Sequence, residues 1–193
     1  MCQKKVFTEL IEDVKKQIRK HASFFHYPRK YEKTKELSIA IRFFEGLRSL
    51  EGRKFRNIKN GDDPPDIMAF NSLGEKIALE LTELVNEDAI NSQIQGKRSY
   101  FSEVVSWDKD NTLDEIQNII NKKSKSLEAV YSDAYSAVFL LLFTDEPKLP
   151  FKRVNQFVNN HNWEIPLNIN EAYILFSYTP DKDLPDYPVM KLW

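Results

Sequence analysis

The sequence predicts a single α/β domain, built around a central mixed β-sheet with helices on its faces. Segments with helical spacing of apolar residues alternate with short strand-like segments, and two of the later strands are continuously apolar, as expected of strands covered on both faces. A length of 193 residues with 41% hydrophobic content is enough for one substantial core. We therefore expect one domain over residues 1–193.

Two helices are predicted before any strand. Residues 8–21 begin with Thr8, which can cap a helix, and place apolar residues at helical spacing. Residues 32–50 show the same i, i+3, i+4 recurrence at Leu37, Ala40, Ile41, Phe44, Leu47 and Leu50. Residues 51–65 are polar and end in two prolines, which cannot continue a helix. We expect this stretch to be a loop that leads into a strand.

A β-hairpin is predicted next in the chain. Residues 66–70 and 76–85 are strand-like, and they flank residues 71–75, whose Asn, Ser and Gly are typical of a hairpin connection. A loop of this length makes Phe70 face Lys76 and Met68 face Ala78.

The second half of the chain is expected to add two helices and two buried strands. Residues 112–115 (TLDE) form a capping-box pattern that opens a helix. Its inward residues are Ile116, Ile119, Ile120, Leu127 and Val130. Residues 136–143 and 171–178 are strands, and a helix over residues 151–160 connects them.

Composition points to a cytoplasmic protein that does not enter a membrane. The only cysteine is Cys2, so the sequence can build neither a disulfide framework nor a cysteine-based zinc site. The amino-terminal residues do not resemble a secretory signal, and the longest apolar run, residues 137–143, is far shorter than the roughly 20 residues that cross a bilayer.

Charge is unevenly distributed along the chain. Residues 1–60 carry 16 basic and 7 acidic residues, or +9, whereas residues 61–193 carry 12 and 22, or −10. A basic amino-terminal third can supply phosphate contacts, notably from residues 4–20 and 29–48, while the acidic remainder can hold a cation. Solvated faces of surface helices give the same pattern, so charge alone does not decide the function.

The predicted hairpin brings two acids together. Thirteen residues separate Asp66 from Glu80, and in the expected register the two face each other about 5 Å apart at Cβ. Two carboxylates this close repel each other unless a cation lies between them, and oxygen ligands suit Mg²⁺ or Mn²⁺. Glu36 is the first candidate for a third acid, because helical spacing puts it near the inward stripe, and Glu45 is the second. An ordinary exposed position is the alternative for both.

The run PPDIMAFNSLGEKIALELTEL resembles motifs II and III of the PD-(D/E)XK nuclease superfamily. This resemblance implies a restriction-endonuclease-like core over residues 32–143, with residues 1–31 as a helical extension and residues 144–193 completing the sheet. It also implies that Asp66, Glu80 and the backbone carbonyl of Leu81 are metal ligands. The chain departs from the family motif at Thr82, where the family has its catalytic lysine.

The missing lysine is the main question about catalysis, because threonine cannot supply a positive charge to the phosphate. We expect the replacement from the next helix, with Lys97 as the first candidate and Gln93 or Gln95 to position water. Lys76 is too far along the strand, since four residues span about 13 Å. Glu83 points to the opposite face by strand alternation, although a twist at the strand end would make it an additional acid.

Other motifs carry less information about function. The chain has neither a glycine-rich phosphate loop nor a G-x-S-x-G elbow, and its histidines are not spaced as metal ligands. Trp107, Trp163 and Trp193 are expected in the core or an interface more than on bases.

The sequence therefore predicts a Mg²⁺- or Mn²⁺-dependent endonuclease acting on DNA, with Asp66, Glu80, Thr82 and Lys97 as catalytic candidates. A homodimer is left open. Two alternatives are a catalytically degenerate nuclease-fold module that binds nucleic acid or protein, and an unrelated α/β protein whose acids lie far apart.

Overall fold

The protein is a six-stranded mixed sheet with helices on both faces, and the computed structural model describes residues 32–86, 107–128, 134–177, 179–181 and 183–193. The predicted α/β class is thereby confirmed. The strands lie side by side in the order β1-β2-β3-β4-β5-β6, with β3, β4 and β5 parallel and the other neighbours antiparallel. The described elements are α2 (Glu32–Glu51), β1 (Arg56–Asn60), β2 (Ile67–Phe70), β3 (Lys76–Glu83), α4 (Lys109–Ser126), β4 (Ala137–Thr144), α5 (Phe151–Val158), β5 (Glu171–Phe176) and β6 (Val189–Lys191).

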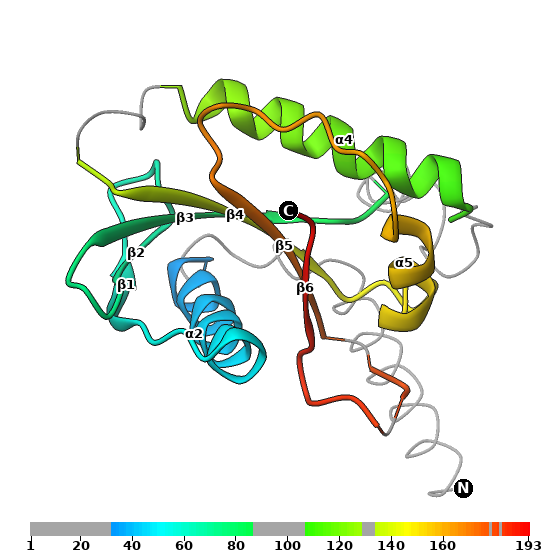
Figure 1. Ribbon diagram of the computed structural model, residues 1–193, viewed down its shortest axis with the longest axis horizontal. Helices are drawn as coiled ribbons and strands as arrows, with labels where there is room; N and C mark the ends of the chain where they lie inside the picture. Colours follow the sequence, from blue (N-terminus) through cyan, green and yellow to red (C-terminus); the bar gives the residue numbers. More distant parts are fainter. Residues whose placement is uncertain (1–31, 87–106, 129–133, 178, 182) are drawn as a thin grey trace, which may run out of the picture.

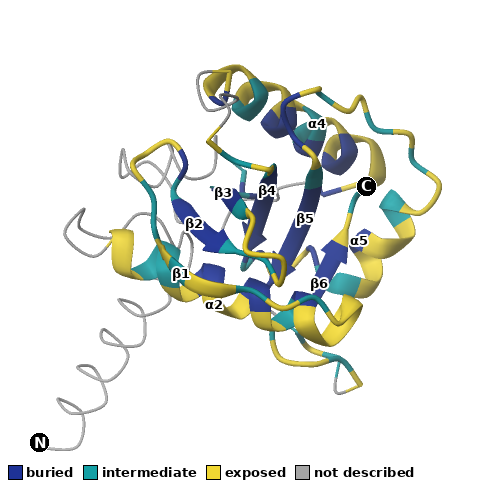
Figure 2. Cartoon of the chain, turned by 60° about the vertical axis from the view of Figure 1, so that its left-hand side comes forward, coloured by how far each residue is buried: buried dark blue, intermediate teal, exposed yellow. Residues whose placement is uncertain are grey.

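The helices divide between the two faces of the sheet, with α2 on one face and α4 and α5 on the other (Figure 1). Alternate residues of the central strands enter two separate cores: Phe139, Leu141 and Tyr173 pack with α2, whereas Leu140 and Ile174 pack with α4 and α5. Strands β4 and β5 are therefore buried on both faces (Figure 2), as their continuous apolar runs predict.

The predicted hairpin forms in the expected register. Phe70 pairs with Lys76 and Met68 with Ala78, so residues 71–75 are the connection. Asn71 closes the turn, since its side-chain oxygen accepts from the backbone N–H groups of Leu73 and Glu75. The other elements predicted within the described residues are also confirmed, with ends that differ from the expected ones by one to two residues except at the start of α4.

Strand β1 corrects the expectation that residues 51–65 are only a loop. Its register with β2 shifts between Arg56 and Lys59, and Asn57 has a positive φ of 52° within this irregularity. The extra residue lets both Phe55 and Ile58 pack against the core on the α2 face. A half-exposed strand with a bulge has no regular alternation, so the sequence pattern conceals it.

Helix α4 begins earlier than predicted. Its N-cap is Asp108, whose side chain accepts from the backbone N–H of Asn111 at 2.9 Å. Thr112 lies inside the first turn, is buried, and donates its hydroxyl to the carbonyl of Asp108. Thr112 is therefore a buried helix residue and not the cap.

Some predictions lie outside the described residues, namely the helix over residues 8–21 and the inward position of Val130. No helix within the described ranges is long and apolar enough to cross a membrane. Strand β6 was not predicted, because three residues are too few to show a period.

Candidate active site

The loop between β1 and β2 determines the position of Asp66. The backbone N–H of Gly61 donates to the carbonyl of Asp66 at 2.8 Å, which closes the loop. A Cβ atom at position 61 would overlap the carbonyl oxygen of Pro65, so only glycine fits this close approach. Asp66 then leads directly into β2, and its Oδ2 accepts from the backbone N–H of Leu81 at 2.7 Å.

Asp66 is in an environment that resists its negative charge. Burial and the nearby charge of Glu80 raise its pKa to about 7, against the opposing effects of the Leu81 N–H and the Lys123 ammonium. The charge of Glu36 raises it further. Near neutral pH this carboxyl group is therefore close to the midpoint of its titration.

Glu80 is the most deeply buried acid of the site, with 5% of its surface exposed. Its Oε1 accepts from the Nζ of Lys123 at 2.7 Å. Its Oε2 is buried and has no hydrogen-bond partner among the described residues. A buried carboxylate oxygen without a partner is costly, so this oxygen marks a position where a ligand would be stabilised.

Lys123 is the residue that the sequence analysis missed. It lies in the last turn of α4, and α4 covers the same sheet face to which Glu80 points. The inward stripe of α4 provides a signal that could have identified it: Ile119, Ile120 and Leu127 lie on that stripe, and Lys123 occupies the helical step between them. A lysine on an apolar stripe needs a buried acidic partner, and Glu80 is that partner.

The last turn of α4 is held in place by the loop before β5. Ser124 donates its hydroxyl to Asn168 Oδ1 at 2.8 Å, and Asn168 Nδ2 donates to the Ser124 carbonyl at 2.6 Å. About two turns earlier, Gln117 donates to the carbonyl of Glu164 and accepts from its N–H. These two clamps limit the positions that the Lys123 side chain can reach.

The backbone of Leu81 also faces Asp66. The N–H and C=O of one strand residue point to the same side, so the Leu81 carbonyl lies on the edge of β3 to which its N–H donates. Strand β2 pairs with β3 only as far as Leu79, which leaves this edge outside the ladder. The carbonyl implied as a ligand therefore lies on the same side of β3 as the Asp66 carboxylate.

Glu36 is close enough to act on the acids through its charge. Burial first, and then the charges of Glu32 and Asp63, raise the pKa of Glu36, and Glu80 adds to this effect. It does not join a compact ligand cluster: within the described ranges, no three Asp, Glu, His or Cys side chains are grouped as a metal site. Two carboxylates and a carbonyl remain, an all-oxygen set that suits Mg²⁺ completed by substrate phosphate.

The remaining candidates are distributed as follows. Thr82 is half-buried and shares the face of Glu80 by strand alternation. Lys76 lies over the Tyr135 ring at 4.3 Å, away from the acids. Glu83 points to the opposite face, where its charge acts on Lys35 of α2. The candidates in the following segment, Lys97, Gln93 and Gln95, lie outside the described residues.

The tryptophans are core residues, as expected. Trp107 is buried among the α4-face residues, and Trp163 and Trp193 pack against the same cluster. His161 contacts the Trp163 ring edge to face with centroids 4.3 Å apart, which indicates a packing role.

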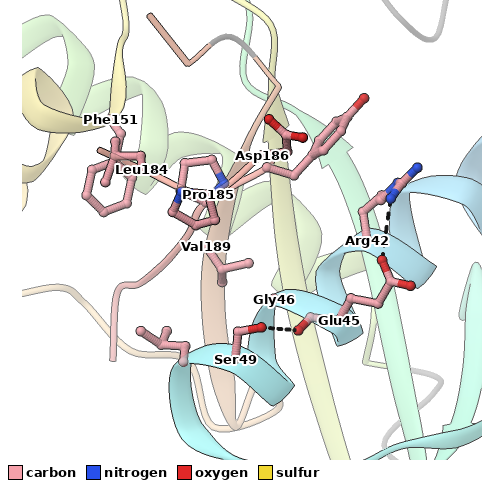
Figure 3. A pocket seen from close by; sticks show the side chains of 12 residues that line it. Arg42, Glu45, Gly46, Ser49, Phe151, Leu184, Pro185, Asp186 and Val189 are labelled. Atoms are coloured by element: carbon pink, nitrogen blue, oxygen red, sulfur yellow. Dashed lines mark hydrogen bonds and ion pairs between the residues drawn. The ribbon is translucent and has the colours of Figure 1, made fainter. Parts of the chain in front are cut away.

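A cavity of about 330 Å³ lies apart from this site, between α2 and the segment leading to β6 (Figure 3). Glu45, the second candidate for a third acid, lines it and pairs with Arg42 at 3.5 Å. Glu45 therefore belongs to the cavity and not to the acidic site. Neither Asp66 nor Glu80 contributes to its walls.

Comparison with known proteins adds no further assignment. No family model matches the chain, and neither a curated protein nor a solved structure matches it.

Proposed function

We propose that the protein is a metal-dependent nuclease of the PD-(D/E)XK type that hydrolyses phosphodiester bonds in DNA. The observation that carries the proposal is the buried Oε2 of Glu80, which has no partner among the described residues, in a carboxylate whose charge acts on Asp66 and whose Oε1 accepts from Lys123. A cytoplasmic location is part of the proposal.

The donor atoms fit a divalent cation. Asp66, Glu80 and the Leu81 carbonyl would hold Mg²⁺ or Mn²⁺, which when bound would activate a water molecule and neutralise charge on the scissile phosphate. The raised pKa of Asp66 fits this role, because two acids share a buried site without enough positive charge. Glu36 would add negative charge from α2 without direct ligation.

Lys123 is the proposed substitute for the family lysine that Thr82 replaces. Its ammonium is within hydrogen-bond distance of Glu80, as a lysine that stabilises charge on the attacked phosphate should be. The Leu81 N–H donates to Oδ2 of Asp66 and so fixes the orientation of the carboxylate. The other oxygen, Oδ1, would then be the one that binds the cation. Thr82 would contribute a neutral hydroxyl on the same face.

A degenerate module that binds nucleic acid or protein is the second candidate. The observation in its favour is the Lys123–Glu80 ion pair, which already neutralises the buried acid. In that case the acids would be structural, and removing them would leave partner binding intact.

The deciding experiment is nicking of supercoiled plasmid with Mg²⁺ or Mn²⁺ by wild type, Asp66→Asn, Glu80→Gln and Glu83→Gln. The first two variants remove a charge from the site without changing its shape, and the third makes the same change on β3 on the opposite face. We expect Asp66→Asn and Glu80→Gln to lose cutting by about 100-fold or more, with Glu83→Gln close to wild type.

Calorimetric titration of Mn²⁺ accompanies the cutting assay. Binding that disappears in Asp66→Asn supports the metal site independently of cutting. Wild type that neither cuts nor binds the cation would refute the nuclease proposal and favour the binding module.

A further inference from the structure

Strand β1 presents a row of basic side chains on the face of the sheet that carries the acids. The segment from residue 52 to residue 61 has four basic residues and no acidic one. Arg53 turns inward to Glu171, but Arg56 and Lys59 are exposed. Within the described residues neither of these two forms an ion pair.

The bulge in β1 gives both side chains the same orientation. Regular alternation would put Arg56 and Lys59 on opposite faces, because they are three residues apart. The extra residue at Asn57 reverses this: Phe55 and Ile58 both enter the α2 core, so Arg56 and Lys59 both point to the other face. That other face is the one to which Glu80 points, toward Lys123 of α4.

The pairing registers place this row beside the acidic site. Lys59 pairs with Met68, which pairs with Ala78. Asp66 lies two residues before Met68, and Glu80 lies two residues after Ala78. Along the strands, the two acids therefore lie about 7 Å from the level of Lys59. Arg56 pairs with Phe70, so it lies on the same line as Lys59 but further from the acids.

The acids near this row are few and lie at its two ends. Glu75 is at the hairpin turn, where it is bonded to Asn71, and Asp62 and Asp63 follow β1 toward the site. The middle of the row is therefore positive, whereas the site itself is negative. A polyanion would be held beside the acids at Arg56 and Lys59 and not on them.

We propose that Arg56 and Lys59 bind the backbone phosphates of the DNA duplex that flank the phosphate attacked at Asp66 and Glu80. This inference rests on the proposed nuclease function and names its substrate-binding surface. Each DNA strand carries one phosphate per about 3.4 Å of helix axis, so a row of this length spans two or three phosphates. Basic side chains on the strand would thus fix the register of the duplex on the site.

The test measures binding without cutting. Fluorescence anisotropy with a labelled duplex in EDTA compares wild type, the double variant Arg56→Glu/Lys59→Glu, the neutral variant Arg56→Gln/Lys59→Gln, and Lys109→Glu with Lys125→Glu as the charge-matched control. Lys109 and Lys125 are exposed on α4 and outside the β1 row. The control therefore changes net charge by the same amount as the double reversal.

Two lost phosphate contacts have a defined signature. The slope of log affinity against log salt should fall by about 2 in the neutral variant, which means that about tenfold of the salt sensitivity between 50 and 200 mM disappears. The charge-reversed variant should bind at least tenfold more weakly than wild type, and the control should change affinity less than threefold.

Equal weakening in the control and the β1 variants would overturn the inference, because net charge alone would then explain binding. Unchanged affinity and slope in both β1 variants would overturn it as well. Circular dichroism and thermal melting establish that each variant is folded, and the neutral variant serves if the charge-reversed one is not. Loss of cutting in Asp66→Asn tests the nuclease proposal separately, because this variant keeps the β1 row.

Discussion

Asp66 is the residue whose charge state controls the whole site. Burial and Glu80 raise its pKa to about 7, so near neutrality the folded protein retains a proton that an exposed aspartate would lose. A cation competes with this proton, and the site is therefore sensitive to pH and to divalent metal at once.

The free energy of unfolding of the metal-free protein should fall as pH rises from about 4 to about 7. The pKa of Asp66 is higher in the folded state than the ordinary 3.8, so the folded state binds more protons and its stabilising contribution is complete below about pH 4. This contribution is lost as pH rises toward 7, and it amounts to at most about 4 kcal/mol. Urea unfolding across this window should show a smaller decline in Asp66→Asn than in wild type.

A residual decline is expected in that variant, because burial and the charge of Glu83 also raise the pKa of Asp145 to about 7. Combining Asp66→Asn with Asp145→Asn should flatten the profile further. An Asp66→Asn profile parallel to that of wild type would contradict the assignment.

Lys123 leads to a prediction that separates catalysis from packing. Lys123→Met leaves Glu80 buried without its partner, which should lower the free energy of unfolding by about 1–3 kcal/mol and abolish nicking. Mg²⁺ should restore part of the stability, because it supplies the missing positive charge, but not the cutting. Thermal melts with and without Mg²⁺ measure this, with Lys125→Met as the exposed control on the same helix.

The sequence was informative about the acids and uninformative about the lysine for a physical reason. Asp66 and Glu80 belong to one hairpin, whose loop length determines which residues face each other. Lys123 reaches Glu80 from 43 residues away, through the packing of α4 on the sheet. The local pattern favours a nearby lysine such as Lys97, whereas the inward position of Lys123 follows from the apolar stripe of α4.

The two hydrogen bonds between Asn168 and Ser124 hold the last turn of helix α4. Asn168→Ala removes both hydrogen bonds and should loosen the last turn of α4, at a cost of about 1–2 kcal/mol. We expect nicking to fall by about tenfold or more, as for other residues that orient a catalytic group. Gln117→Ala removes a similar pair of bonds further from Lys123 and should lower stability alone.

Element prediction succeeded where burial imposes a clear period. The apolar run of β4 follows from a strand that is buried on both faces, and the spacing of α2 follows from the buried positions Ala40, Phe44 and Leu47. Ile41 and Leu50, which the spacing placed on the same stripe, are exposed instead. Strand β1 was not predicted, because its bulge breaks the alternation of buried and exposed residues and its side chains are mostly exposed. The predicted start of α4 was wrong, because Asp108 and Thr112 are both residue types that cap helices. Only the hydrogen bond from the Asn111 N–H identifies Asp108 as the cap.

At the scale of the whole molecule, metal binding should appear as stabilisation. A cation that binds only the folded state at 100 times its dissociation constant adds about 2.7 kcal/mol, or roughly 5–11 °C in Tm for a protein of this size. The shift should be larger at about pH 8 than at about pH 6, because Asp66 must lose its proton first. Differential scanning calorimetry of wild type and Asp66→Asn checks this, and equal shifts in both proteins would contradict it.

The separation of the site between a local hairpin and a distant helix also has a consequence for folding kinetics. The contact between Asp66 and Leu81 closes 15 residues, whereas that between Lys123 and Glu80 closes 43. Short loops close at lower entropic cost, so the hairpin with both acids should form before α4 brings its lysine. During that interval the carboxylates repel each other without compensation, and a divalent cation in the refolding buffer should accelerate folding in stopped-flow experiments.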